Sequence, residues 1–284
     1  MEEFQLKEMT PCVDPLHFDE LPFWSAPFGL ALLDTVQVRS GMKVLDIGSG
    51  GGFPMLELAD RLDAGSFVTG IDPDEGCNGL AREKIRSRGI INANVIQGYA
   101  EKMPFKDECF DLIISNNGLN NVQDLHASLK ESFRVLKPNG QMVFTMNLPG
   151  TFAEFYEVLE GLLDDLALGA VKDLTKQHIH EKRKPVDYLR AHVLATGFAI
   201  RSVQPDGFTY RYADGTAFFN HFLIRNYFMP SWRQILAGAE VLHVFREIET
   251  RLNGIAKASG SLQMSVPFVT FDLNKSETRN PNPL

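Results

Sequence analysis

Cysteine is scarce in this 284-residue sequence, which has only Cys12, Cys77 and Cys109, far apart along the chain. No CxxC pair and no His/Cys spacing typical of a zinc site occurs. An odd number of widely spaced cysteines favours simple reduced thiols. We therefore expect no disulfide framework and no metal site.

Long apolar runs and a targeting segment are also absent. No window approaches the roughly 18 uninterrupted apolar residues typical of a membrane span. The first ten residues, MEEFQLKEMT, are acidic and lack the basic and apolar regions of a secretory signal. Because the chain is 44% hydrophobic and 23% charged, as ordinary soluble proteins are, we expect a cytoplasmic protein with no membrane partner.

An excess of positive charge, which broad nucleic-acid binding requires, is missing too. The formal net charge is −8 at pH 7, so a nucleic-acid partner is disfavoured. One basic cluster, HIHEKRKP at 178–185, is interrupted by Glu181 and is typical of a solvated helix end. His178 and His180 are two residues apart and do not share a helix face, which argues against a metal site there.

Up to about residue 147 the sequence alternates short apolar runs with segments of helical spacing. The predicted strands are KVLDI (43–47), SFVTGID (66–72), NANVIQG (92–98), FDLIISN (110–116) and GQMVFTMN (140–147). Helical segments over Met55–Leu62, Cys77–Arg88 and Leu125–Leu136 lie between them, which predicts a largely parallel sheet. The last of these helices ends in LKPNG, where Pro138 stops the helix and Asn139-Gly140 turns into the fifth strand.

The second half of the chain has longer helical patterns and many aromatic residues. Residues 151–168 have the spacing of an amphipathic helix, and PVDYLRAHVLATGF predicts another helix that Pro185 opens and Gly197 stops. AIRSVQPDGFTYRY has strand character, residues 216–258 are helical in pattern, and SLQMSVPFVTFDLN predicts a last strand.

These patterns divide the chain into six parts. They are an N-terminal helical segment (1–40), a core (41–150), a helical insert (151–184), a core helix and strand (185–214), a second helical insert (215–258), and a last strand with a polar tail (259–284). The two inserts are candidates for a lid over the carboxyl edge of the sheet, where open α/β sheets bind ligands.

The segment VLDIGSGGGFPMLELA, which runs from Val44 to Ala59, places glycines between a strand and a helix. A Walker loop is excluded because the segment has no lysine. The dinucleotide fingerprint GxGxxG fits Gly48 and Gly50, but its third position is Phe53, which is too large for the close helix–strand contact that the motif requires. The pattern that fits is an acid on the strand, Asp46, followed by glycines at 48, 50 and 52.

This pattern resembles the first motif of class I S-adenosylmethionine-dependent methyltransferases of the small-molecule, ubiquinone-biosynthesis type. Three later segments extend the resemblance in the same order: Gly70-Ile71-Asp72 with its acid at the end of the second strand, GYAEKMPFKDECFDLIIS, and ASLKESFRVLKPNGQMVF. Together they cover about residues 40–147. The resemblance implies an α/β, Rossmann-like three-layer sandwich with a seven-stranded, mostly parallel sheet, an antiparallel last strand and helical lid insertions.

The resemblance also implies the cofactor S-adenosyl-L-methionine and the product S-adenosyl-L-homocysteine. The core at 41–150 would bind this cofactor, and the N-terminal helical segment at 1–40 would cover its site. The cofactor carries an ammonium, a sulfonium and one carboxylate, so its net positive charge suits a pocket that contains acids. Asp46 would anchor the ammonium side, Asp72 would hold the ribose diol, and Pro73 would offer an apolar surface to the adenine. Relatives often have an acid where this chain has Tyr99, so backbone groups or the Tyr99 hydroxyl would bind the adenine amine. The implied cofactor-binding residues are Asp46, Gly48, Ser49, Gly50, Gly52, Phe53, Asp72, Pro73, Tyr99, Ala100, Glu101 and Asn116.

The segment after the fourth strand, SNNGLNNVQD, narrows the choice of methyl acceptor. It lacks the Asn/Asp-Pro-Pro-Tyr of DNA-adenine and glutamine-amide methyltransferases, and Asn117 stands where arsenite methyltransferases have a metal-binding cysteine. Aromatic residues in and beside the inserts favour a mostly apolar pocket for a small or medium-sized organic acceptor. The candidate substrate-binding residues are Trp24, Phe28, Asn117, Phe155, Tyr210 and His221.

Methyl transfer from a sulfonium is an in-line displacement, and it needs a base only where the acceptor must lose a proton. No His/Asp pair identifies such a base. His221 is the candidate, and a core or interface histidine is the commoner alternative. The first hypothesis is therefore a small-molecule methyltransferase, with a homodimer left open. An RNA- or protein-directed methyltransferase of the same core, or a non-catalytic S-adenosylmethionine-binding protein, are the alternatives.

Overall fold

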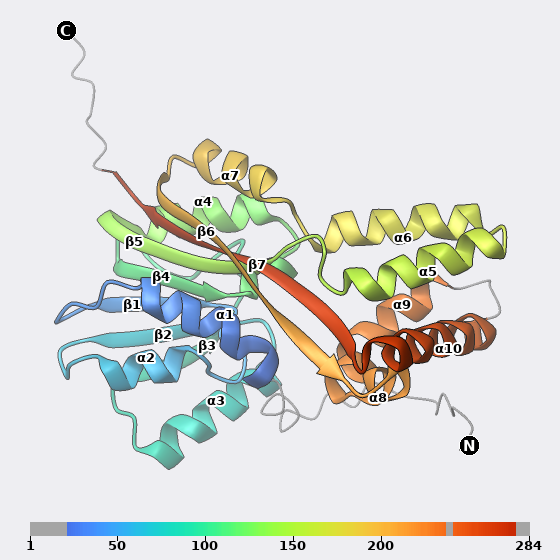
Figure 1. Cartoon of the computed structure of the whole chain (residues 1–284). Helices are drawn as coiled ribbons and strands as arrows, with labels where there is room; N and C mark the ends of the chain where they lie inside the picture. The colour runs from blue at the N-terminus through green and yellow to red at the C-terminus, as the bar shows by residue number, and fades with distance from the viewer. Residues whose placement is uncertain (1–21, 237–240, 277–284) are drawn as a thin grey trace, which may run out of the picture. The chain divides into compact units, whose positions relative to one another are not determined.

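The computed structural model describes residues 22–236 and 241–276 (Figure 1). Cys12, the first part of the predicted N-terminal segment and the polar tail after residue 276 lie outside the described residues. The elements are α1 (Pro22–Thr35), β1 (Lys43–Ile47), α2 (Met55–Arg61), β2 (Phe67–Asp72), α3 (Glu75–Arg88), β3 (Ala93–Gln97), β4 (Phe110–Asn116), the 3-10 helix η2 (Gly118–Asn121), α4 (Leu125–Val135), β5 (Leu136–Asn147), α5 (Ala153–Asp165), α6 (Gly169–Lys182), α7 (Val186–Ala195), β6 (Ala199–Tyr212), α8 (Gly215–Asn220), the π-helix η3 (Ile224–Phe228), α9 (Met229–Ile235), α10 (Val241–Ser259) and β7 (Leu262–Asn274).

Seven strands form one sheet in the order β3-β2-β1-β4-β5-β7-β6. The pairs β1–β2, β1–β4, β2–β3 and β4–β5 are parallel, whereas β7 runs antiparallel to β5. The predicted fold class is thus confirmed. The strand order reverses direction between β1 and β4, and ligands of open α/β sheets bind beyond the carboxyl ends of the strands at such a point.

Two compact units divide the described residues. The sheet unit comprises residues 22–147, 185–206 and 268–276, and the helical unit comprises residues 148–184, 207–236 and 241–267. The predicted inserts at 151–184 and 215–258 fall within the helical unit.

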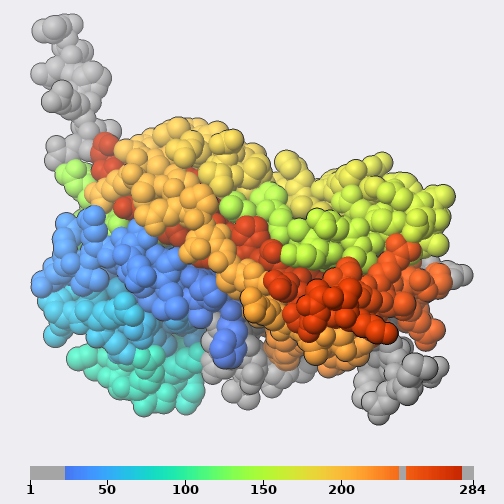
Figure 2. Space-filling model, in the orientation of Figure 1, coloured from blue at the N-terminus to red at the C-terminus, as the bar shows by residue number. Residues whose placement is uncertain are grey.

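The strands of the sheet unit are covered by helices. α1 packs against β4 and β5, α2 against β2, and α3 against β2 and β3. In the space-filling view the residues of α1, coloured blue, form the surface in front of the strands (Figure 2). Val44, Leu112 and Val143 are fully buried, in agreement with the apolar strands of the sequence.

The turn predicted at LKPNG lies inside an irregular strand. Phe110 pairs with Leu136 and Leu112 with Gln141, so the four residues between them bulge out of the β4–β5 ladder. Asn139 adopts a left-handed φ of 62°, and its N–H donates to the carbonyl of Lys275 (2.7 Å). Pro138 has no N–H to contribute to a ladder, which explains why the irregularity falls here.

The helical unit has an aromatic core. α5 packs against α6 and α10, and α8 packs against α10. Trp232 stacks on Phe155, with 4.0 Å between ring centroids, and its Nε1 donates to the hydroxyl of Tyr156 (2.9 Å). None of the helices in the described part of the chain is both long and apolar enough to cross a membrane.

Candidate functional site

The glycine loop after β1 lies against the start of η2. Gly48 adopts a left-handed φ of 72°, and a Cβ built there would stand 2.8 Å from the Cα of Gly118. A Cβ on Gly118 would stand 2.4 Å from the carbonyl oxygen of Ile47. Both positions require glycine because two backbones meet there. Gly50 and Gly52 also have left-handed φ angles, of 49° and 101°.

Asp46, near the carboxyl end of β1, has a fully buried carboxyl group. Neither of its oxygens has a hydrogen-bond partner, and the hydroxyl of Ser49 is also buried without one. Burial, and then the charge of Asp72, raise the pKa of Asp46 well above its usual range. A buried acid of this kind lacks a donor or a cation, which a ligand can supply.

Asp72 ends β2 and is held by two backbone donors. The N–H groups of Gly50 and Asp74 donate to its two carboxyl oxygens, each at 2.9 Å. Burial raises the pKa of Asp72, and these two hydrogen bonds partly offset that rise. The carboxylate is thereby fixed beside the glycine loop, and each oxygen keeps a lone pair for a further donor. The next residue, Pro73, is exposed.

The segment after β3 is linked to both Asp72 and the start of α4. The N–H of Gly98 donates to the backbone carbonyl of Asp72 (3.1 Å). Ala100 is buried, whereas the side chain of Tyr99 is 60% exposed. A carboxyl oxygen of Glu101 accepts from the N–H groups of Gln123 (2.8 Å) and Asp124 (3.3 Å), so Glu101 joins this segment to the N-terminus of α4.

Helix α1 contacts the same edge of the sheet through Asn116 and the glycine loop. The side-chain amide of Asn116 donates to the carbonyl of Ser25 on α1 (3.1 Å) and accepts from the hydroxyl of Thr145 (3.1 Å). The ring of Phe53 lies against Gly29 of α1, where a Cβ would be 2.3 Å from it. Phe53 therefore packs on α1.

The candidate acceptor residues of α1 differ in accessibility. Trp24 is half-buried and its ring lies 5.3 Å from that of Phe28. Phe28 is fully buried and packs on Phe268 of β7 (4.8 Å), so it belongs to the core of the sheet unit.

An asparagine cluster that the sequence did not reveal follows β4. Asn117 has a left-handed φ of 58°, and its side-chain oxygen accepts from the backbone N–H of Asn147 at the end of β5 (3.1 Å). The amide nitrogen of Asn120 donates to the side-chain oxygens of both Asn117 and Asn147, while its own oxygen is buried without a partner. The asparagine-rich run SNNGLNN was the only available signal, since Asn147 is distant in sequence.

The helical unit brings Tyr210 and His221 together and adds Tyr212. The ring centroids of Tyr210, Tyr212 and His221 lie 5.4–5.9 Å apart. Both hydroxyls and the Nδ1 of His221 are buried without hydrogen-bond partners. Burial lowers the pKa of His221, raises that of Tyr210 to about 12 and raises that of Tyr212. Phe155, by contrast, is a fully buried core residue.

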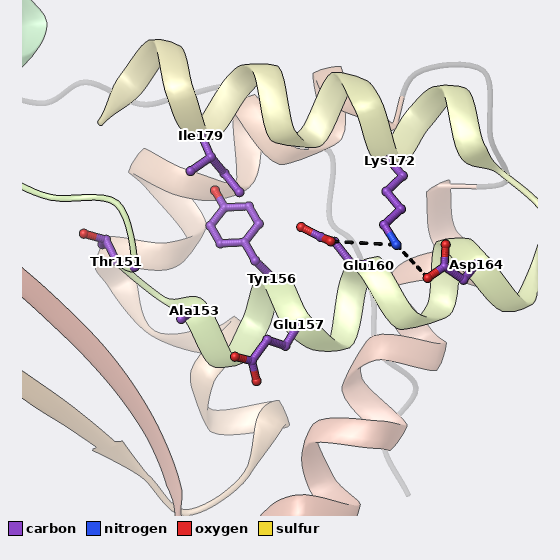
Figure 3. Close-up of a pocket in the computed structure, with 9 residues that line it drawn as sticks. Thr151, Ala153, Tyr156, Glu157, Glu160, Asp164, Lys172 and Ile179 are labelled. Atoms are coloured by element: carbon purple, nitrogen blue, oxygen red, sulfur yellow. Dashed lines mark hydrogen bonds and ion pairs between the residues drawn. The ribbon is translucent and has the colours of Figure 1, made fainter. Parts of the chain in front are cut away.

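A separate pocket of about 440 Å³ lies between α5 and α6 (Figure 3). Tyr156 and Ile179 lie at one end, and Lys172 lies at the other, paired with Asp164 (2.6 Å) and Glu160 (3.9 Å). Glu157 adds a third carboxylate, so this pocket is acidic.

The residues at the carboxyl edge of the sheet unit fit the cofactor that the sequence predicts. The unpartnered carboxyl of Asp46 suits an ammonium group, the anchored carboxylate of Asp72 suits a diol, and at Gly50 no atom lies within 4 Å of the position that a Cβ would take. The structure brings together Asp46, the loop, Asp72 and Asn116. The roles of these residues stay predictions.

Comparisons with known proteins point the same way. A family profile described as "Methyltransferase domain" matches residues 38–184, which is just over half of the chain. The ubiquinone/menaquinone biosynthesis C-methyltransferase UbiE of Xylella fastidiosa is 42% identical over 109 residues, which cover 38% of this chain and 43% of the relative. A demethylmenaquinone methyltransferase of Listeria welshimeri is 34% identical over 119 residues, 40% of this chain and 50% of the relative. The match thus spans about half the length of these relatives.

A solved structure extends the likeness of the fold beyond the part that these sequences match. The YcgJ protein of Bacillus subtilis superposes with a TM-score of 0.59 over 89% of this chain and 99% of its own, at 18% identity. Such a likeness establishes the fold alone. Together with the family match it confirms the resemblance predicted from the glycine loop and the three later segments. The chain therefore belongs to the methyltransferase domain family, among the class I S-adenosylmethionine-dependent methyltransferases.

Proposed function

We propose that this chain transfers a methyl group from S-adenosylmethionine to a small or medium-sized organic acceptor. The observation that carries the proposal is the buried, unpartnered carboxyl of Asp46 at the end of β1, next to a loop that requires glycine. Such a carboxyl destabilises the protein alone and becomes favourable beside a cation. The family to which the chain belongs supports the same cofactor.

The chain's own residues would bind and orient the donor. Asp46 would pair with its ammonium, directly or through water, and Asp72 would accept hydrogen bonds from the ribose hydroxyls while Gly50 and Asp74 hold it in place. Asn116 would lie near the methionine portion, and Pro73 and Ala100 near the adenine. When bound, S-adenosylmethionine supplies an electrophilic methyl group on a sulfonium.

The acceptor is proposed to be small because the polar groups that could bind it are few and lie among aromatic rings. In the helical unit, Tyr210, Tyr212 and His221 offer two hydroxyls and one ring nitrogen without partners. A mostly apolar surface with a few polar atoms is typical of small-molecule sites. His221, whose pKa is lowered by burial, would be neutral near pH 7 and able to accept a proton from the acceptor. A cytoplasmic location and a homodimer remain predictions from the sequence.

Calorimetric titration of the full chain with S-adenosylmethionine tests the donor half of the proposal. We expect saturable binding that Asp72→Ala weakens by about 100-fold, because two charge-assisted hydrogen bonds are lost. Asp111→Asn is the matched control. Asp111 lies near the start of β4, at the opposite end of the strand from Asn116, and pairs with Lys137 (2.8 Å). The affinity for S-adenosylmethionine should therefore be unchanged. Absence of binding, or equal losses in both variants, would contradict the proposal.

A methyl-transfer screen tests the acceptor half. Labelled S-adenosylmethionine and the purified chain are incubated with a metabolite extract, with bulk tRNA and with protein. Methylation confined to the metabolite extract supports the proposal. Methylation of tRNA or protein alone would favour the macromolecule-directed alternative.

A further inference from the structure

Arg183, which directly follows α6, is a buried cation without an anionic partner. Its side chain is 4% exposed, and Nε and Nη1 are buried with no hydrogen-bond partner. Among the described residues no carboxylate forms an ion pair with it. A buried guanidinium is ordinarily paired and hydrogen-bonded, because an unpaired charge loses its hydration without compensation.

The groups around Arg183 position the guanidinium but accept no hydrogen bond from its Nε or Nη1. It lies over the rings of Tyr156 and Phe228, 5.9 Å and 5.8 Å from their centroids. Tyr156 is itself fixed by the hydrogen bond from Trp232, and the backbone N–H of Arg183 donates to Ile179 (2.9 Å). Aromatic faces attract a cation, but they leave the in-plane N–H donors without acceptors.

Arg183 follows Glu181 and Lys182, two residues of opposite charge, at the end of α6. The pKa of His178 is lowered by burial and then by the charges of Arg183 and Lys182, with Glu181 acting in the opposite direction. The carbonyl groups at the C-terminal end of α6 also attract a cation. None of them accepts a hydrogen bond from Nε or Nη1 of Arg183. The end of the helix therefore leaves these donors free for another group.

The acidic pocket between α5 and α6 does not supply the missing anion. Its carboxylates Glu160 and Asp164 are paired with Lys172 (Figure 3). Tyr156 and Ile179, which both contact Arg183, line the opposite end of the pocket. Arg183 itself is not among the residues that line the pocket, so the two sites share Tyr156 and Ile179 but remain distinct.

We propose that Arg183 binds the oxyanion of a small ligand, a carboxylate or a phosphate, within the helical unit. The planar fork of the guanidinium matches two oxygens of either group, and the flanking rings exclude water from the pair. This proposal is independent of methyl transfer, because its test uses neither the methyl donor nor an acceptor.

Thermal melts and calorimetry of the full chain, with inorganic phosphate or with benzoate at constant ionic strength, test the site. We expect saturable stabilisation by at least one of the two anions over sodium chloride. Arg183→Lys keeps the charge but loses the fork, so it should bind about tenfold more weakly. Arg183→Met should show no saturable binding. Arg233→Met, which removes an exposed arginine on α9 of the same unit, should bind as the wild type does.

The melting temperature without added anion separates a ligand site from a structural role. If Arg183 is an anion-binding residue and not a structural one, Arg183→Met should melt at or above the wild-type temperature in sodium chloride, because the substitution removes an unpaired buried charge. Saturation by phosphate alone would identify a phosphate site, and saturation by benzoate alone a carboxylate site. The proposal is overturned if neither anion stabilises the wild type, or if Arg183→Met is stabilised equally.

Discussion

Within the residues that the structure describes, the sheet unit and the helical unit both bury polar side-chain atoms without partners, but only the helical unit has nitrogen atoms among them. In the described part of the sheet unit they are all oxygens: Oδ1 and Oδ2 of Asp46, Oγ of Ser49, Oδ1 of Asn78 and Oδ1 of Asn120. In the described part of the helical unit, the unpartnered atoms are Nε and Nη1 of Arg183, the hydroxyls of Tyr210 and Tyr212, and Nδ1 of His221. The first set suits a cationic ligand rich in donors, and the second contains the donors that an anion or a ligand oxygen requires.

In each unit, the unpartnered atoms indicate which hydrogen-bonding groups a ligand would have to supply. An unsatisfied buried polar group costs roughly 1–3 kcal/mol, and a ligand that supplies the partner recovers this free energy. Removing such a group should therefore stabilise the ligand-free protein and weaken ligand binding. Removing a group that is already paired should destabilise the protein.

The largest effect is expected from Gly118→Ala in the sheet unit. The new Cβ would stand 2.4 Å from the carbonyl of Ile47, so the glycine loop or η2 must move. We expect a loss of about 2–3 kcal/mol in the free energy of unfolding, measured in urea, together with loss of S-adenosylmethionine binding.

Gly79→Ala on α3 is the matched control for this substitution. Nothing lies within 4 Å of its new Cβ, and alanine favours a helix interior, so a gain of roughly 0.5–1 kcal/mol is expected. A Gly118→Ala variant as stable as the wild type would show that the two backbones do not meet as described.

Asp46→Asn should separate stability from binding in the sheet unit. Because the pKa of Asp46 is raised in the folded state, the folded protein binds the proton more tightly than the unfolded chain. The stability of the ligand-free wild type therefore falls as the pH rises from about 4 through the raised pKa. At pH 7 we expect the ligand-free variant to melt about 2 °C or more above the wild type, with a difference that shrinks toward pH 4.

S-adenosylmethionine binding to the same variant should weaken by about tenfold or more, because an amide cannot neutralise an ammonium. Calorimetry at pH 7 measures this loss. A ligand-free variant that melts below the wild type would mean that Asp46 already has a stabilising partner in the fold.

Much of the sheet unit could be predicted from sequence because its signals are local. Apolar runs, Pro138 and the acid–glycine pattern located the strands, the irregularity near the start of β5 and the loop that follows Asp46. Residues 199–212 were predicted as a strand and form β6. These features depend on neighbours a few residues apart, which a single sequence displays.

The polar partners across each unit could not be predicted in this way. Asn120 meets Asn147 only through the register of β4 and β5, and Glu101 reaches Gln123 across the same edge of the sheet. Arg183 belongs to a cluster that is typical of a solvated helix end. Its side chain is nevertheless buried, and its guanidinium lies over the rings of Tyr156 on α5 and Phe228 on η3. Tertiary packing, which no local pattern specifies, decided these three cases.

A pair of tyrosine substitutions extends the contrast to the helical unit. Tyr156→Phe removes the acceptor of the Trp232 Nε1–H and leaves a buried donor unsatisfied, so we expect a loss of about 1–2 kcal/mol in urea unfolding. Tyr212→Phe removes a buried hydroxyl without a partner, so stability should be unchanged or higher by up to about 1 kcal/mol. Equal losses in the two variants would show that the hydroxyl of Tyr212 is satisfied within the fold. It would then be no more available to a ligand than that of Tyr156.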